Sequence, residues 1–113
     1  MPSIEHYEFG RIVIDGEEQR RDVIVLPDRV VPGWWRREGH ALVLEDLADV
    51  LDDLPDRLIV GTGATGRMRP DPEALEALAA RGVEVEVLPT PEAVRRFGEL
   101  EPGARAAALH LTC

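Results

Sequence analysis

Short apolar runs alternate along this chain with two segments that each begin with a capping residue followed by proline. Asp71-Pro72 and Thr90-Pro91 open these two segments, in which apolar residues then recur at helical spacing. Gly82 is a typical stop for the first of the two helices. Apolar runs with the length of strands lie at residues 23–26 and 58–60, and residues 83–88 alternate valine with glutamate, which also predicts a strand. Strands alternating with helices predict an α/β domain with a mixed sheet and helices packed over it.

The N-terminal part of the chain is predicted to form a β-hairpin. Residues 4–9 and 11–14 are rich in strand-forming side chains. Asp15-Gly16 then separates residues 11–14 from the apolar run 23–26, and an Asp-Gly pair between two such runs favours a hairpin turn. We therefore expect these two runs to pair.

Two further segments are assigned from period and context. Residues 45–54 carry leucines at helical spacing with aspartates on the other faces, which predicts a helix that Pro55 ends. In residues 105–112 the run Ala106-Ala107-Ala108 favours a helix by propensity. We interpret this segment as a strand, because it is too short for a stable helix and the neighbouring strands need a partner.

Length and charge limit the classes of protein that this chain can belong to. Its 113 residues predict a single domain over 1–113, and 22 acidic against 13 basic side chains give a formal net charge of -9. This charge disfavours nucleic acid as a partner, because the chain repels a polyanion. No apolar stretch is long enough for a membrane span, and the N-terminus has no signal-peptide pattern. We expect a cytoplasmic protein without membrane contact.

Several kinds of catalysis are excluded by missing residues. The chain has no lysine, so it has neither a P-loop lysine nor a lysine that could form a Schiff base. Ser3 is the only serine, so the G-x-S-x-G nucleophile elbow is absent. Whether the chain catalyses a reaction is left open, with a preference for a non-enzymatic role.

A glycine-rich loop follows the apolar run at residues 58–60. Gly61, Gly63 and Gly66 satisfy G-x-G-x-x-G, a spacing that can present main-chain amides to a phosphate. A dinucleotide site is disfavoured, because the loop does not run directly into a helix. A tight turn with structural glycines and a small-anion site both remain open. Thr62 and Arg67 favour the anion site, since hydroxyl and guanidinium groups complement oxyanions.

Tryptophan and arginine adjoin at residues 34–37 of a chain that is otherwise acidic. Trp34, Trp35 and Arg36 have the composition of interface anchors, which predicts a protein-binding surface. The alternative is that one indole closes the core while the arginines stay solvated.

The histidines and the single cysteine do not assemble into an obvious site. His110 and Cys113 have a spacing found in zinc sites, but residues three apart on a strand point to opposite faces. Nothing places a base or an oxyanion donor beside the thiol. We assign no catalytic residue, no metal and no cofactor.

Several short motifs, taken in order along the chain, resemble a known family of domains of unknown function. This family includes an adipogenesis-associated protein and a mitochondrial respiratory complex I assembly factor. The motifs are Tyr7-x-Phe9-Gly10, Asp22-Val23-Ile24, Trp35-x-x-x-Gly39-His40, Val60-Gly61-Thr62-Gly63, Thr90-x-x-Ala93-Val94 and His110-x-Thr112-Cys113. The resemblance spans nearly the whole chain.

The resemblance implies a three-layer α/β fold with a mixed central sheet, and action through protein partners in some members. It also implies a pocket near the glycine-threonine loop, with Trp35, His40, Gly61, Thr62, Gly63, Thr90 and His110 as residues of interest. Our leading hypothesis is a binding or assembly module whose loop at residues 61–66 accepts a small anion. The alternative is a small enzyme or ligand sensor that uses His40 or His110 in the same cleft.

Overall fold

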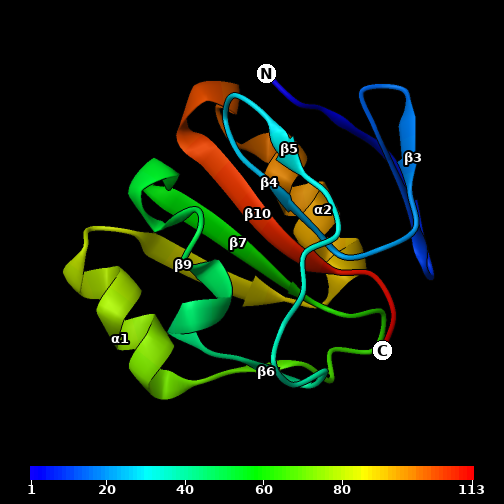
Figure 1. Cartoon of the computed structure of the whole chain (residues 1–113). Helices are drawn as coiled ribbons and strands as arrows, with labels where there is room; N and C mark the ends of the chain where they lie inside the picture. Colours follow the sequence, from blue (N-terminus) through cyan, green and yellow to red (C-terminus); the bar gives the residue numbers. More distant parts are fainter.

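A mixed sheet of five strands forms the centre of the protein, described here by a computed structural model that covers residues 1–113. β10 runs parallel to β7, and β7 runs parallel to β9, whereas β4 lies antiparallel to both β10 and β5 (Figure 1). In spatial order the strands are β5 (Val30–Val31), β4 (Val23–Val25), β10 (Arg105–His110), β7 (Arg57–Thr62) and β9 (Glu84–Leu88). The mixed sheet predicted from the sequence is confirmed.

The alanine-rich segment is the central strand β10, as predicted. Ala106 and Ala108 pack into one core cluster, whereas Ala107 and Leu109 pack into the other, and all four are fully buried. This alternation is that of a strand covered on both faces. The context of the sheet therefore overrides the helix propensity of the three alanines.

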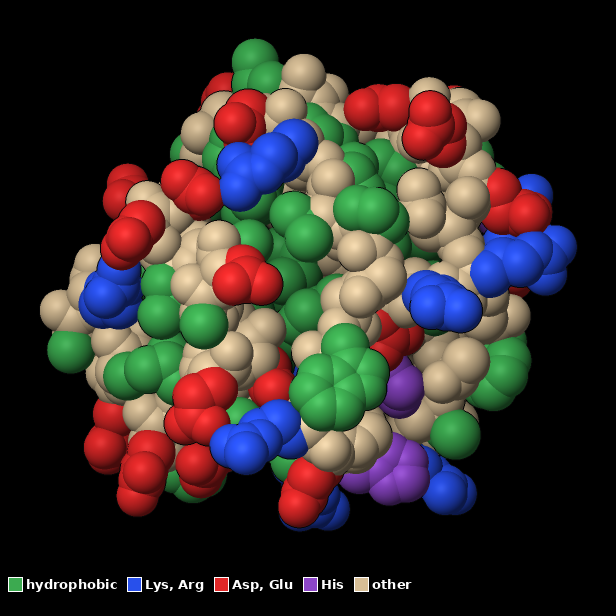
Figure 2. Space-filling model, in the orientation of Figure 1, with side chains coloured by type: hydrophobic (Ala, Val, Ile, Leu, Met, Phe, Trp, Pro, Cys, Tyr) green, Lys and Arg blue, Asp and Glu red, His purple; other side chains and the backbone are tan.

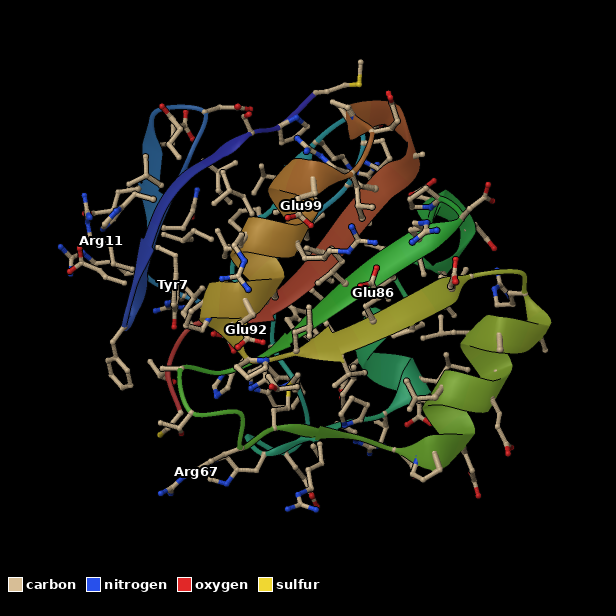
Figure 3. All side chains as sticks on the ribbon, turned by 180° about the vertical axis from the view of Figure 1, so that it is seen from behind. Tyr7, Arg11, Arg67, Glu86, Glu92 and Glu99 are labelled. Carbon is tan, nitrogen blue, oxygen red and sulfur yellow. The ribbon has the colours of Figure 1, made fainter.

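Each face of the sheet is covered, which gives three layers. One face is covered by α1 (Pro72–Ala80), the two turns η1 (Leu44–Leu47) and η2 (Leu51–Asp53), and the parallel pair β6 (Ala41–Leu42) and β8 (Arg69–Pro70) (Figure 1). The opposite face is covered by α2 (Thr90–Glu99) and by the antiparallel sheet of β1 (Ile4–Glu8), β2 (Arg11–Ile14) and β3 (Glu17–Gln19) (Figure 3). No helix is both long and apolar enough to cross a membrane.

The hairpin turn lies where the sequence predicts it, but its second strand is different. Asp15 and Gly16 have φ values of 50° and 82°, as the favoured two-residue hairpin turn requires. The turn joins β2 to the short strand β3. Pairing with the run at residues 23–26 was a wrong prediction. All three residues of β4 are buried, so this strand needs a position covered on both faces and lies in the central sheet.

The predicted helix at residues 45–54 is also wrong, since this segment forms the two 3₁₀ turns η1 and η2. In an α-helix the amide of Val50 would donate to the carbonyl of Asp46. That carbonyl instead accepts the indole N–H of Trp34 at 2.8 Å, and the Val50 amide donates to Leu47 at 3.0 Å. A contact from a distant part of the chain therefore favours the tighter turn.

The two helices predicted at Asp71-Pro72 and Thr90-Pro91 are confirmed, but neither Asp71 nor Thr90 caps its helix through the side chain. α1 starts at Pro72, and the main-chain carbonyl of Asp71 accepts the amides of Ala74 and Leu75. After α1, Gly82 has a φ of 84°, the left-handed conformation typical of a residue that ends a helix. α2 starts at Thr90 itself, one residue earlier than a capping role would place it. The Thr90 side chain is consequently available for other contacts.

Candidate functional site

The carboxyl ends of the parallel strands meet at one edge of the sheet. β7 ends at Thr62, which lies opposite His110 at the end of β10, and Gly61 lies opposite Leu88 at the end of β9. In open α/β sheets this edge is where ligands usually bind. The glycine-threonine loop at residues 61–66 and the N-terminus of α2 both lie here, so the structure brings together residues that are far apart in sequence.

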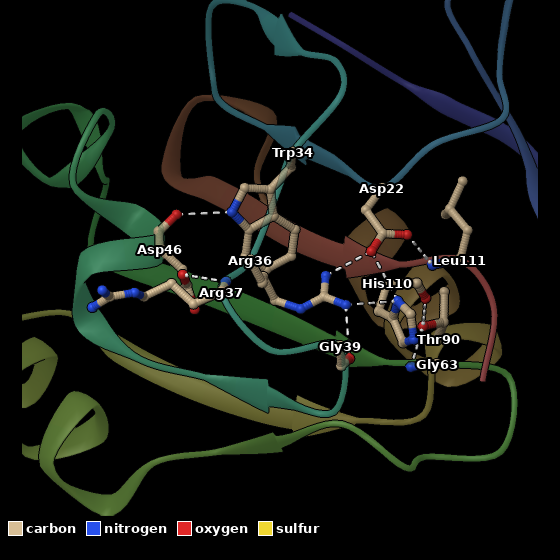
Figure 4. Close-up of polar contacts among 10 residues, drawn as sticks. All are labelled: Asp22, Trp34, Arg36, Arg37, Gly39, Asp46, Gly63, Thr90, His110 and Leu111. Atoms are coloured by element: carbon tan, nitrogen blue, oxygen red, sulfur yellow. Dashed lines mark hydrogen bonds and ion pairs between the residues drawn. The ribbon is translucent and has the colours of Figure 1, made fainter.

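Thr90 connects the loop to the central strand. Its buried hydroxyl donates a hydrogen bond to the carbonyl of His110 at 2.6 Å and accepts one from the amide of Gly63 at 2.8 Å (Figure 4). A Cβ atom on Gly61 would lie 2.9 Å from the Thr90 hydroxyl and 2.8 Å from Leu109 Cδ2. Gly61 is thus required for the close approach of α2, and the predicted residues Gly61, Gly63, Thr90 and His110 converge.

Most of the loop's remaining polar groups have partners within the protein. The amide of Ala64 donates to the carbonyl of Thr112 at 2.6 Å, and the amide of Gly66 donates to Gly63 at 3.2 Å. The hydroxyl of Thr62 donates to the carbonyl of Leu88. Arg67 is exposed and makes no ion pair. These contacts agree with a structural turn, and anion binding by the loop stays a prediction.

Gly63 is the residue that joins the loop to the end of the chain. Its φ of 106° is a conformation that side chains with a Cβ rarely adopt. A Cβ there would lie 2.7 Å from the carbonyl oxygen of Thr112 and 2.9 Å from Cδ2 of His110. The Gly63 backbone therefore forms one wall against the imidazole of His110.

Three ionisable side chains from separate elements form a cluster beside this wall (Figure 4). Nδ1 of His110 lies 2.8 Å from Oδ2 of Asp22, and the guanidinium of Arg36 donates to the same oxygen at 2.6 Å. The other carboxylate oxygen accepts the amide of Leu111 at 2.8 Å. Arg36 also donates to the carbonyl of Gly39 at 2.9 Å. Asp22 therefore ties together the start of β4, the end of β10 and the segment that follows Trp34.

These contacts change the proton affinity of groups around the cluster. Burial alone raises the pKa of Asp22, but hydrogen bonds from His110, Leu111 and Arg36 outweigh it, and the pKa lies below its ordinary value. Burial, together with the charge of Asp22, raises the pKa of Tyr7. The Tyr7 hydroxyl donates to the carbonyl of Leu111 at 2.8 Å. Asp22 is thus held as a carboxylate and Tyr7 as a neutral phenol.

Asp22 and Arg36 both contact the same nitrogen of His110. Nδ1 lies 2.8 Å from Oδ2 of Asp22 and 3.0 Å from a guanidinium nitrogen of Arg36. A protonated Nδ1 donates to the carboxylate, whereas an unprotonated Nδ1 accepts from the guanidinium. In either case these contacts orient the ring, and Nε2 has no hydrogen-bond partner within the chain.

The tryptophan pair divides between core and surface. Trp34 is 8% exposed, its indole N–H donates to the carbonyl of Asp46, and the Arg36 guanidinium lies 5.0 Å from its ring centre. Arg36 is equally buried, whereas Trp35 is 76% exposed. Of the predicted interface residues Trp34, Trp35 and Arg36, only Trp35 is therefore available to a partner. The other two hold its segment in place.

Two hollows lie on the face that presents Trp35. The smaller, of about 370 Å³, is lined by Trp34 and Trp35 together with acidic residues of the adjoining turns. The larger, of about 600 Å³, extends to α1. Arg37, Glu45 and Asp46 line both hollows, so the two adjoin along these residues. Neither hollow reaches the glycine-threonine loop or His110, so ligand binding near this loop stays a prediction.

Comparison with known sequences places the chain in a family. Residues 4–111 match the family described as a protein of unknown function, DUF498/DUF598. The chain belongs to this family. A conserved hypothetical protein of Pyrococcus horikoshii is 32% identical, with a TM-score of 0.83, and the match covers 98% of this chain and 99% of that one. The description of this family names neither a reaction nor a ligand.

Other solved structures share the fold at lower identity. A protein of Bartonella henselae described as an outer membrane protein is 26% identical over 97% of this chain and 94% of that one, with a TM-score of 0.81. A Mth938-like domain of Bordetella pertussis is 20% identical over 96% and 85% of the two chains, with a TM-score of 0.75, and shows the fold alone. The DUF498/DUF598 fold is therefore common to proteins that share few identical residues.

The most connected residue of the site has only a weak signal in the sequence. In the sequence Asp22 stands out only as part of the motif Asp22-Val23-Ile24. Its partner His110 lies 88 residues away. Asp46 was interpreted as part of a solvated helix face, but its carboxylate accepts the amides of Val43 and Arg37. In this DUF498/DUF598 member, main-chain amides that donate to these two carboxylates hold both side chains in place.

Proposed function

We propose that this protein is a non-enzymatic binding or assembly module that contacts a protein partner through Trp35. The observation that carries the proposal is the exposure of this indole, at 76%, beside two adjoining hollows. Tryptophan is the side chain most enriched among residues that dominate binding energy, and such residues usually lie beside pockets. The resemblance to a family that includes a respiratory complex I assembly factor supports the same class of function.

The segment that carries Trp35 is held in place before any partner arrives. Trp34 donates to Asp46, Arg36 donates to Asp22, and the Arg37 amide donates to the Asp46 carboxylate. A preorganised anchor loses little conformational freedom on binding. Burying its indole in an interface would contribute about 2–3 kcal/mol.

A photo-cross-linking residue in place of Trp35 tests this proposal. Benzoylphenylalanine at position 35 is expected to give a discrete adduct with one cellular protein when it is irradiated in the native host. Phe9 is the matched control, because it is also aromatic and 63% exposed but lies in the N-terminal sheet, between β1 and β2. If position 35 yields no adduct, or the same adducts as position 9, the proposal fails.

Proton transfer by His110 is a second candidate function. It is favoured by the contacts of Nδ1 with Asp22 and Arg36, which orient the ring and leave Nε2 without a partner in the chain. Diethyl pyrocarbonate, which modifies neutral imidazole, is expected to react with His110 at Nε2 and to react differently after Asp22→Asn. His6 and His40 are exposed internal references. Lack of reaction at His110 in the folded protein would contradict this candidate.

The predicted anion site remains a narrower proposal. The amides of Thr65 and Arg67 have no acceptor within the chain, and the Arg67 guanidinium lies beside them in sequence. Inorganic phosphate at millimolar concentration is expected to raise the melting temperature of the wild type and not of Arg67→Gln. Equal shifts for both proteins would show that the loop is only a turn.

We also propose a cytoplasmic location, where a free thiol such as that of Cys113 is kept reduced. Fractionation of the native host is expected to recover the protein with cytoplasmic markers. Recovery with the envelope, where the Bartonella henselae relative is described to belong, would contradict this proposal.

A further inference from the structure

The two hollows beside Trp35 form a continuous acidic groove, which we define by the carboxylates of Glu38, Glu45, Asp46, Asp49, Asp71 and Glu73. Figure 2 shows acidic side chains gathered over α1 and the neighbouring turns on this face. Arg37 is the only basic residue that lines either hollow. The groove therefore has a concentrated negative charge that the chain itself does not neutralise.

The carboxylates of the groove differ in their partners. Glu45 pairs with Arg37 at 2.9 Å, and Asp46 accepts two main-chain amides. The three others that line the larger hollow have no ion pair and no side-chain hydrogen bond; they are Glu38, Asp71 and Glu73. Several carboxylates elsewhere are paired with arginine, among them Glu18 and Glu86. These three carboxylates of the larger hollow are thus available to pair with a cation from outside the chain.

Apolar side chains line the larger hollow together with the acidic ones. They are those of Ala41, Val43, Leu44, Ala74 and Ala77. Low-dielectric walls focus the field of charges at a cleft, which strengthens attraction for an opposite charge. An arginine or lysine side chain matches such a site, because its aliphatic stem packs on apolar atoms while its charged head reaches the carboxylates. The exposed ring of Trp35 can hold a second cation by cation–π attraction.

We infer that the acidic groove binds a basic segment of the partner protein, with at least one arginine or lysine side chain in the larger hollow and another over Trp35. This inference rests on the proposed binding function of Trp35 and names the chemistry of its partner. A second copy of this chain is a poor occupant, because each copy carries a net charge of -9 and would repel the other.

Selection from an unbiased displayed library of random 12-residue peptides tests the inference without knowledge of the natural partner. The wild type is expected to enrich arginine and lysine in the selected peptides at least threefold over the starting library. Glu38→Gln/Asp71→Asn/Glu73→Gln removes the unpaired charges of the larger hollow and is expected to abolish this enrichment. Trp35→Ala is expected to abolish selection of the same peptides.

A matched variant controls for net charge. Glu17→Gln/Glu92→Gln/Glu101→Gln also removes three exposed carboxylates without ion pairs, but none of them lines a hollow. The best selected peptide is expected to lose about tenfold in affinity with the groove variant and less than threefold with the control, in fluorescence anisotropy at 150 mM salt. Circular dichroism checks that each variant is folded.

The outcomes separate this inference from the proposed function. Equal losses for the groove and control variants would show attraction to the overall charge and overturn the inference. Peptides that depend on Trp35 but lack basic residues would overturn it as well, while the proposed binding function would stand. Selected peptides that do not depend on Trp35 would refute both.

Discussion

The buried hydroxyl of Thr90 allows a sharp test of whether the glycine-threonine loop is held by the protein itself. Thr90→Val keeps the shape of the side chain but removes the donor to His110 and the acceptor for the Gly63 amide. Each of the two buried polar groups left without a partner costs about 1–3 kcal/mol, so the expected loss in free energy of unfolding is about 2–6 kcal/mol. That is a large part of the roughly 5–15 kcal/mol that stabilises a domain.

Thr90→Ser is the matched control. Serine keeps both hydrogen bonds and loses one buried methyl group, which costs about 1 kcal/mol. Urea unfolding followed by the fluorescence of the buried Trp34 measures both variants. Hydrogen exchange adds a local readout, because the Gly63 amide is expected to exchange faster in Thr90→Val and to stay protected in Thr90→Ser. A valine variant within 1 kcal/mol of the wild type, or no less stable than the serine variant, would refute this reasoning.

Three further predictions concern the same region. Gly63→Ala is expected to destabilise the fold by about 2–4 kcal/mol, because the new Cβ would clash with neighbouring atoms and the backbone has a positive φ. Gly98→Ala in α2 is the control: a Cβ there has no atom within 4 Å, so this variant should stabilise the fold by about 0.5–1 kcal/mol in thermal unfolding. Trp34→Ala is expected to cost about 3–5 kcal/mol and Trp35→Ala less than about 0.5 kcal/mol, with acrylamide quenching only the latter indole in the wild type. The folded-state pKa of Asp22 lies below its unfolded value, so its stabilisation is present above about pH 4 and is lost as the pH falls through the folded pKa. Asp22→Asn should therefore differ most from the wild type near neutral pH and approach it in acid-unfolding curves; a constant difference at all pH values would contradict this.

Local patterns predicted the elements that depend on local interactions. The bounds of α1 follow from Asp71, Pro72 and Gly82, which act through neighbouring backbone groups. The assignment of β10 as a strand was possible because parallel neighbours require a partner in the sheet. These features need no knowledge of which distant residues meet.

The errors arose where a distant contact decides between two local possibilities. Asp15-Gly16 identifies a turn but not the length of the strand that follows, so the hairpin partner was misassigned. The helical spacing of leucines at residues 45–54 suits two 3₁₀ turns as well as a helix, and the Trp34 indole decides between them. No spacing in the sequence indicates the contact between Asp22 and His110. The two residues are 88 positions apart, and they meet only because β4 and β10 are neighbours in the sheet.

The buried ionic cluster explains why an exposed tryptophan can be a dependable anchor in so small a domain. The Trp34 amide donates to the carbonyl of Asp22 at 2.7 Å, and the Arg36 guanidinium donates to the carboxylate of the same residue. The residues before and after Trp35 are thus both tied to the start of β4, and both are buried. Trp35 lies between two fixed points and is directed outward, so its exposure follows from how its neighbours are held. Breaking a buried ion pair is costly, because it leaves an uncompensated charge. The cluster therefore resists loosening of this segment, and a partner would meet an indole that is already in position.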